Sequence, residues 1–93
     1  MSQKQEMNEE TLLEFPCQFP IKALGLADCD LDLRVVEIIR KHVPDLREGA
    51  VKSRLSSGGK YTSVTVTITA TSLTQIHAIY RELSDCADVL MTL

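Results

Sequence analysis

The residues best suited to chemistry in this sequence are its cysteines and histidines, and their spacing limits what they can do. Cys17, Cys29 and Cys86 are an odd number, and no two of them form a Cys-x-x-Cys pair. A disulfide framework uses cysteines in pairs, and a structural zinc site uses closely spaced ligands. His42 and His77 have no serine, cysteine or carboxylate at a recognisable catalytic spacing. The sequence therefore predicts no metal, no cofactor and no catalytic site, and we expect a protein that is not an enzyme.

One glycine-rich segment, Ser57 to Lys60, invites comparison with a phosphate-binding loop. Such a loop needs the pattern Gly-x-x-x-x-Gly-Lys-Ser/Thr, placed between a strand and the N-terminus of a helix. Here Gly58 and Gly59 lie between two segments that both alternate like strands. The glycines are therefore predicted to form a hairpin turn, in which positive φ angles carry no steric cost.

Length and charge restrict the class of protein further. The chain has 93 residues and a formal net charge of -3, which suits a single domain and opposes long-range attraction to nucleic acid or anionic lipid. No apolar run approaches the roughly 20 residues of a membrane helix, and the polar start lacks the apolar middle of a signal peptide. We expect a cytoplasmic protein with no membrane contact. Residues 1–14 are predicted to be a flexible arm, and residues 15–93 a single domain.

The first half of the domain predicts a strand followed by a helix. Cys17 to Leu26 is apolar with a polar interruption at Lys22, as in a strand buried on one face. Leu31 to Val43 has apolar residues at helical spacing, and the following Pro44 ends the pattern. Asp28 or Asp30 is expected to cap this helix by accepting a hydrogen bond from its first backbone N–H groups.

The second half predicts a hairpin, a second helix and a last strand. Alternation over Val51 to Ser56 and over Lys60 to Ala70 predicts two antiparallel strands joined by the glycine turn. Ser72 and Gln75 have the spacing of a capping box, which predicts a helix from Leu73 to Ser84. The apolar alternation of residues 89–93 predicts a final strand.

This order of elements, βαββαβ, is typical of the ferredoxin-like α+β fold. We expect a two-layer sandwich, in which two helices cover one face of a four-stranded antiparallel sheet with strand order 4-1-3-2. The other face is left open. Parity within the strands places polar, basic and a few apolar side chains on that face, and the candidates for an interaction surface are Lys22, Leu24, Lys52, Arg54, Tyr61, Thr65 and Thr67. The same reasoning adds Ser63, Leu90 and Thr92.

The open face leaves nucleic-acid binding as an alternative function. RNA-recognition modules of this architecture stack bases on aromatic residues of the central strands. The third strand offers only Tyr61, followed by threonines and valines, although Lys22, Lys52 and Arg54 make the face locally basic. Nucleic acid is therefore not the partner that we favour.

Several short motifs, in order, resemble the YbeD-like family of small bacterial proteins. They are Leu12 to Pro16, then Gly25, then Val35 to Glu37 with His42 and Pro44, then Ser56 to Val64, and the ending Val89 to Leu93. The resemblance extends from about Leu12 to Leu93. It implies a ferredoxin-like domain similar to ACT-type regulatory modules, in a family whose biochemical role is poorly defined and which has been linked to lipoate metabolism.

The favoured hypothesis is a regulatory or protein-interaction domain. It would act by weak self-association into a dimer, or through a protein partner that the sequence does not identify. The resemblance to ACT-type modules also suggests a small effector. Its candidate loop contains Gly25, Asp28 and Asp30, although the two carboxylates would repel an anionic ligand.

Overall fold

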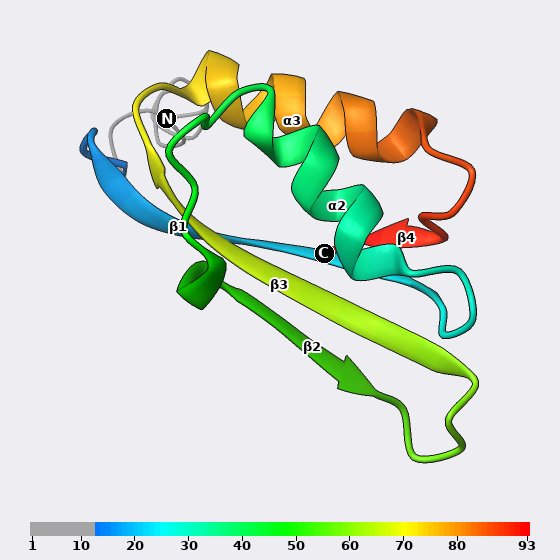
Figure 1. The fold of residues 1–93 in the computed structure, drawn as a ribbon. Helices are drawn as coiled ribbons and strands as arrows, with labels where there is room; N and C mark the ends of the chain where they lie inside the picture. The colour runs from blue at the N-terminus through cyan, green and yellow to red at the C-terminus, as the bar shows by residue number, and fades with distance from the viewer. Residues whose placement is uncertain (1–12) are drawn as a thin grey trace, which may run out of the picture.

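The computed structural model describes residues 13–93, and the arm predicted over residues 1–14 lies outside this range except for its last two residues. Strand β1 (Cys17–Leu26) is followed by helix α2 (Leu31–Arg40) and a short 3-10 helix (Glu48–Ala50). Strands β2 (Val51–Leu55) and β3 (Tyr61–Ala70) form the hairpin, and helix α3 (Leu73–Asp85) leads to β4 (Met91–Thr92). Both helices lie on the same side of the sheet (Figure 1). The predicted α+β two-layer architecture is confirmed.

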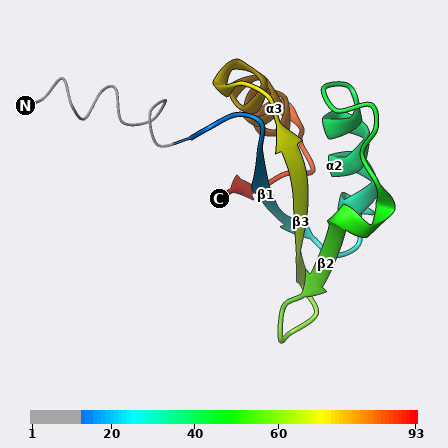
Figure 2. The same cartoon turned by 90° about the vertical axis from the view of Figure 1, so that its left-hand side faces the viewer.

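The sheet is antiparallel throughout, with the order β2-β3-β1-β4, which is the predicted order read from the other edge. The central pair, β1 and β3, is in register over ten residues each, from Cys17 opposite Ala70 to Leu26 opposite Tyr61. In the view of Figure 2, the β2–β3 hairpin extends away from the helices. All residues from Lys52 to Tyr61 are accordingly exposed.

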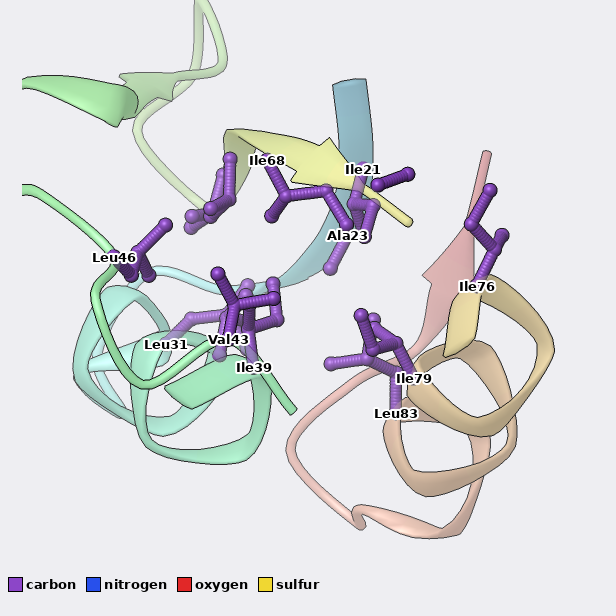
Figure 3. Close-up of a cluster of buried hydrophobic side chains, with 14 residues drawn as sticks. Ile21, Ala23, Leu31, Ile39, Val43, Leu46, Ile68, Ile76, Ile79 and Leu83 are labelled. Carbon is purple, nitrogen blue, oxygen red and sulfur yellow. The ribbon is translucent and has the colours of Figure 1, made fainter. Parts of the chain in front are cut away.

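The core lies between the sheet and the two helices. Figure 3 shows side chains from both layers pointing into the same space, among them Ile21 and Ile68 from the sheet and Ile39, Ile79 and Leu83 from the helices. All residues in the buried set are apolar, and no buried polar or charged residue is found between positions 13 and 93. The buried hydrophobic side chains are Ile21, Ala23, Leu31, Val35, Ile39, Val43, Leu46, Val64, Val66, Ile68, Ala70, Ile76, Ile79 and Leu83.

The two helix starts differ in how they are capped. Ser72 Oγ accepts a hydrogen bond from Gln75 N, as the capping box predicted, while Gln75 Oε1 accepts one from Thr71 N. The prediction for the first helix was wrong, because no aspartate side chain caps α2. Asp30 occupies the N-cap position with φ 49 and ψ 49. A capping side chain reaches the helix N–H groups from an extended backbone, so the left-handed conformation at Asp30 removes that hydrogen bond.

Helix α2 is shorter than its apolar pattern predicted, ending at Arg40 instead of Val43. The chain leaves the helix through turns in which His42 N and Val43 N both donate to Ile39 O. This exit lets Val43 and Leu46 turn into the core. Burial of apolar side chains beyond the helix explains why the apolar pattern outlasts the helix itself.

The last strand differs from prediction in both length and parity. Only Met91 and Thr92 pair with β1, opposite Leu24 and Ala23 respectively. Thr92 therefore faces the helix side and Met91 faces the open side. The predicted placement of Thr92 on the open face was wrong, and Leu90 lies outside the paired residues. The chain turns sharply just before the strand, where Val89 N donates to Cys86 O. Strand alternation begins only after that turn, and residues 89–91 are apolar on both sides, so their sequence pattern could not set the parity.

Candidate functional site

The side of the sheet opposite the helices is the candidate site, and it is called the open face here. Its members are set by the strand registers, because side chains of directly paired residues lie on the same side of a sheet. No described element covers this side. The open face consists of Gln18, Pro20, Lys22, Leu24, Leu26, Lys52, Arg54, Tyr61, Ser63, Thr65, Thr67, Thr69, Met91 and Leu93.

The seven predicted interaction residues all belong to the open face, and the registers bring them into rows across the strands. Thr65 is opposite both Lys52 and Lys22, which places the two lysines on either side of it. In the next row, Ser63 is opposite both Arg54 and Leu24. Cations are therefore concentrated toward the β2 edge of the face. Their role in binding stays a prediction.

The side chains of the open face that carry charge are all basic among the described residues. Lys22, Lys52 and Arg54 are exposed, and none of the face's described members is an aspartate or glutamate. None of these three cations takes part in an ion pair among residues 13–93. The ion pairs found there involve α2, α3 and the segments that follow these helices. Within residues 13–93 the face therefore offers positive charge without an ion-pair partner, although the whole chain carries a net charge of -3.

Toward β1 and β4 the same face becomes apolar. Leu26 is opposite Tyr61, and Leu24 is opposite Met91. Met91 is 51% exposed and Leu93, two residues later, is 66% exposed. A shallow hollow of about 210 Å³ lies where the apolar and basic parts meet, lined by Leu24, Arg54, Leu55, Ser56, Tyr61 and Ser63.

Sequence reasoning missed six members of this face: Gln18, Pro20 and Thr69 at one end of the central strands, and the large apolar residues Leu26, Met91 and Leu93. The position of Leu26 could have been found, because it shares the parity of Leu24 within one strand. The positions of Met91 and Leu93 depend on the turn before β4, for which the sequence carries no local signal. The Leu93 carbonyl is also held by Tyr80 Oη, which donates to it over 3.1 Å.

The predicted effector loop is not assembled into a common pocket. Gly25 is buried inside β1, and a Cβ atom added there would lie 2.4 Å from the Asp88 carbonyl oxygen and 2.9 Å from Leu31 Cδ2. The glycine therefore allows the segment before β4 to approach β1 closely. Asp30 lines a hollow of about 590 Å³ over α2, but Gly25 and Asp28 are not among the residues that line it.

A polar cluster joins the end of α2 to α3. Glu82 accepts hydrogen bonds from His42 Nε2 and from Lys41 Nζ, the latter over 3.1 Å. Gln75 Nε2 donates to the His42 carbonyl oxygen. The hydrogen bond from His42, followed by that from Lys41, holds the pKa of Glu82 below its ordinary value. Because the cluster connects two helices and faces no hollow of the open face, we interpret it as structural.

The cysteines lie apart from this cluster and are free thiols. Cys17, Cys29 and Cys86 are each partly buried. Desolvation, with a further contribution from Asp88, raises the pKa of the Cys29 thiol and so disfavours its nucleophilic thiolate. Between residues 13 and 93, no group of three or more His, Cys, Asp or Glu side chains is arranged to hold a metal ion. In the same range, neither helix combines the length and apolar character that a membrane crossing requires.

Comparison with known proteins agrees with the fold and identifies relatives. A UPF0250 protein of Nitrosomonas europaea is 40% identical over 87 residues, covering 94% of this chain and 100% of the relative. A UPF0250 protein of Serratia proteamaculans is 44% identical over 90 residues, covering 97% of this chain and 99% of the relative. A protein from H. pylori, solved in solution, is similar in fold, with a TM-score of 0.65, 17% sequence identity, and coverage of 87% of this chain and 85% of its own.

The family model described as "Protein of unknown function (DUF493)" matches residues 10–93. This match includes every described strand and helix, from the segment before β1 to the end of β4. The resemblance to small bacterial proteins of the YbeD-like type is consistent with these relatives. The chain therefore belongs to the DUF493 family, whose curated relatives bear the name UPF0250.

Proposed function

We propose that this protein is a non-enzymatic interaction domain, and that the open face is the surface through which it binds a protein partner. The observation that supports this is the composition of the face, where unpaired cations border a row of exposed apolar side chains. Protein interfaces combine an apolar centre with a charged rim in this way. No enzymatic name occurs among the relatives described above, which is consistent with a binding role.

Nucleic acid is the second candidate, favoured by the same three cations. The aromatic stacking that single-stranded nucleic acid requires has less support. Tyr61 is the only aromatic residue of the open face, and the Lys60 ammonium lies 5.7 Å from the centre of its ring. A base would have to displace that lysine before it could stack. The apolar side chains of Leu24 and Met91 also favour a protein surface over a phosphate backbone.

A regulatory version of the proposal, in which a small effector binds at Gly25, Asp28 and Asp30, has weaker support. The space beside Gly25 is filled by the Asp88 carbonyl, and the two exposed aspartates would repel an anion.

Weak self-association through the open face is disfavoured by charge, because a second copy would bring another set of cations to the same surface. A cytoplasmic location stays a prediction.

The proposal is tested by comparing two charge reversals of the same size on opposite sides of the molecule. Arg54→Glu changes the open face, whereas Arg81→Glu changes an exposed position on α3. Tagged wild-type protein and both variants would be used to purify native partners, with bound protein and bound RNA measured separately. We expect a protein partner that is retained by Arg81→Glu and lost by Arg54→Glu, because a charge reversal at an interface replaces attraction by repulsion.

Other results of this capture experiment would favour nucleic acid or contradict a role of the open face. A captured component that disappears after ribonuclease treatment and at raised salt would favour the nucleic-acid alternative. Equal capture by wild type and Arg54→Glu would contradict a role of the open face. Thermal unfolding of both variants, measured beforehand, separates lost binding from lost folding.

A further inference from the structure

Strand β2 is an uncovered edge of the sheet. It pairs only with β3, and its other side faces no strand among the described residues. Its exposure is unusual because it includes both faces of the strand. Lys52 and Arg54 are exposed on the open face, and Ser53 and Leu55 are exposed on the helix side, with Leu55 at 62%. Every residue of β2 after Val51 is exposed, so an approaching chain can reach this edge.

The backbone groups that β2 presents outward can be assigned. Ser56 N donates to Tyr61 O over 2.8 Å, which marks these two residues as a hydrogen-bonded pair. In an antiparallel ladder, hydrogen-bonded pairs alternate with pairs whose N–H and C=O groups point away from each other. Because the register is unbroken from Val51 to Leu55, Lys52 and Arg54 bond inward to β3. The N–H and C=O groups of Ser53 and Leu55 therefore point outward, ready to pair with an added strand, whereas the Val51 N–H already donates to Glu48 O.

Charge argues against a second copy of this chain as the added strand. Antiparallel pairing of two β2 strands about Ser53 would place Lys52 of each copy opposite Arg54 of the other. Sliding the pairing by one hydrogen-bonding step in either direction places Lys52 opposite Lys52, or Arg54 opposite Arg54. Like charges directly opposite each other destabilise a strand pair, and edge lysines protect natural sheets from self-pairing. The edge is therefore accessible to a strand of another protein, whereas like charges oppose its pairing with a second copy of this chain.

We propose that β2 binds an extended segment of a partner protein, in which acidic and apolar residues alternate, as a fifth strand of the sheet. This inference rests on the proposed function, in which the open face binds a protein partner, because it names the kind of segment that the partner would supply. Acidic side chains at alternate positions would lie opposite Lys52 and Arg54 on the open face. The residues between them would lie on the helix side, where Val51 and Leu55 offer apolar contact.

The other free edge is less suitable for the same purpose. Strand β4 has only two paired residues, Met91 and Thr92. The side chains that it presents are uncharged, so it provides no selection between acidic and basic segments. Strand β2 has five paired residues and two exposed cations. An added strand thus gains more main-chain hydrogen bonds and stronger charge selection at β2.

The test uses a short synthetic peptide in which glutamates alternate with valine and threonine. Its controls are a peptide with lysine in place of glutamate and one with the same composition but the glutamates grouped together. We expect binding of the alternating acidic peptide alone, with slowed hydrogen exchange at the amides of Ser53 and Leu55. The double variant Lys52→Glu/Arg54→Glu should weaken binding by at least about tenfold.

A proline substitution distinguishes strand addition from simple charge attraction. Ser53→Pro removes an outward N–H but no hydrogen bond to β3, and proline is tolerated in edge strands on that condition. Ser53→Thr keeps the N–H and is the matched control. We expect Ser53→Pro to weaken peptide binding by about tenfold or more, with Ser53→Thr close to wild type. Thermal unfolding of both variants checks folding, and the exchange of Ser53 and Leu55 in the wild-type protein tests the proposal without any variant.

Three results would overturn this inference. Binding that is lost in the charge variant but unchanged in Ser53→Pro would mean charge attraction without strand addition, which leaves the proposed function intact. A dimer in sedimentation that Ser53→Pro abolishes would make a second copy the occupant of the edge. Absence of binding at about 1 mM of the acidic peptide would exclude this class of partner at any useful affinity.

Discussion

The two sides of the sheet differ in how their charged and apolar groups are satisfied. On the helix side, Lys41 and His42 meet Glu82, Arg34 meets Asp88, and the apolar side chains of the strands are buried. On the open face, no aspartate or glutamate side chain accompanies Lys22, Lys52 and Arg54 among the described residues, and leucine, methionine and tyrosine side chains are exposed. A covered surface serves stability, whereas groups left without a partner are available to another molecule. This difference supports the proposal that the open face, which contributes less to folding, is the binding surface.

The largest difference between the two sides is expected from adjacent residues of β3. Val66 is fully buried, whereas Thr67 is on the open face. Val66→Asp should abolish folding, because burying an unpaired carboxylate costs several kcal/mol or more, comparable with the whole stability of a small domain. Thr67→Asp should leave a folded protein. Thermal unfolding by circular dichroism checks both, and equal stability of the two variants would contradict the assigned sides.

Gly25 and Gly58 differ in the space that the surrounding structure leaves for a side chain. A Cβ at Gly25 would meet the Asp88 carbonyl oxygen at 2.4 Å, whereas a Cβ at Gly58 would meet nothing within 4 Å. Gly25→Ala should therefore destabilise the domain by about 1 to 3 kcal/mol, the usual cost of overpacking. Gly58→Ala should change the free energy of unfolding little. Urea unfolding measures both values, and a neutral Gly25→Ala would mean that the segment before β4 moves away at no cost.

The stability that Glu82 contributes on the helix side should decrease in acid. Because the pKa of Glu82 is lowered in the folded protein, the stabilisation is present above the unfolded pKa and is lost as pH falls through the folded value. Wild type should therefore exceed Glu82→Gln in stability at neutral pH, and the difference should shrink as the solution is acidified below the ordinary glutamate value of 4.5.

Asp85→Asn is the matched control for this prediction, since Asp85 lies on the same helix but forms no ion pair among the described residues. Its stability should follow that of wild type at each pH. Stability would be measured by thermal unfolding across the acid range. A constant difference between wild type and Glu82→Gln would show that the hydrogen bonds to Glu82 do not depend on its charge.

The smallest effect is expected at the cysteines, which belong to neither a metal site nor a disulfide in the described chain. All three are only partly buried, so replacing Cys17, Cys29 and Cys86 together with alanine or serine should lower the melting temperature modestly and leave partner binding unchanged. Differential scanning calorimetry and metal analysis of the purified protein test this. Stoichiometric zinc in wild type that is absent from the triple variant would contradict it.

The local patterns of the sequence determined much of the fold. Alternation over β1 and β3 located both strands and the sides of their residues, the glycine pair marked the hairpin, and Ser72 with Gln75 marked the start of α3. In each case the signal lies in residues close together in the chain, whose interaction does not depend on distant contacts. The same alternation placed the seven candidate interaction residues on one face.

Tertiary structure decided the features that depend on contacts between distant segments. The parity of β4 follows from the turn after α3 and from the close approach of Asp88 to Gly25. The early end of α2 follows from burial of Val43 and Leu46, and the partner of His42 is a glutamate 40 residues away. Apolar runs such as residues 89–91 fit either side of a sheet. Which side they take is set by the space that the rest of the fold leaves, and no spacing within the run contains that information.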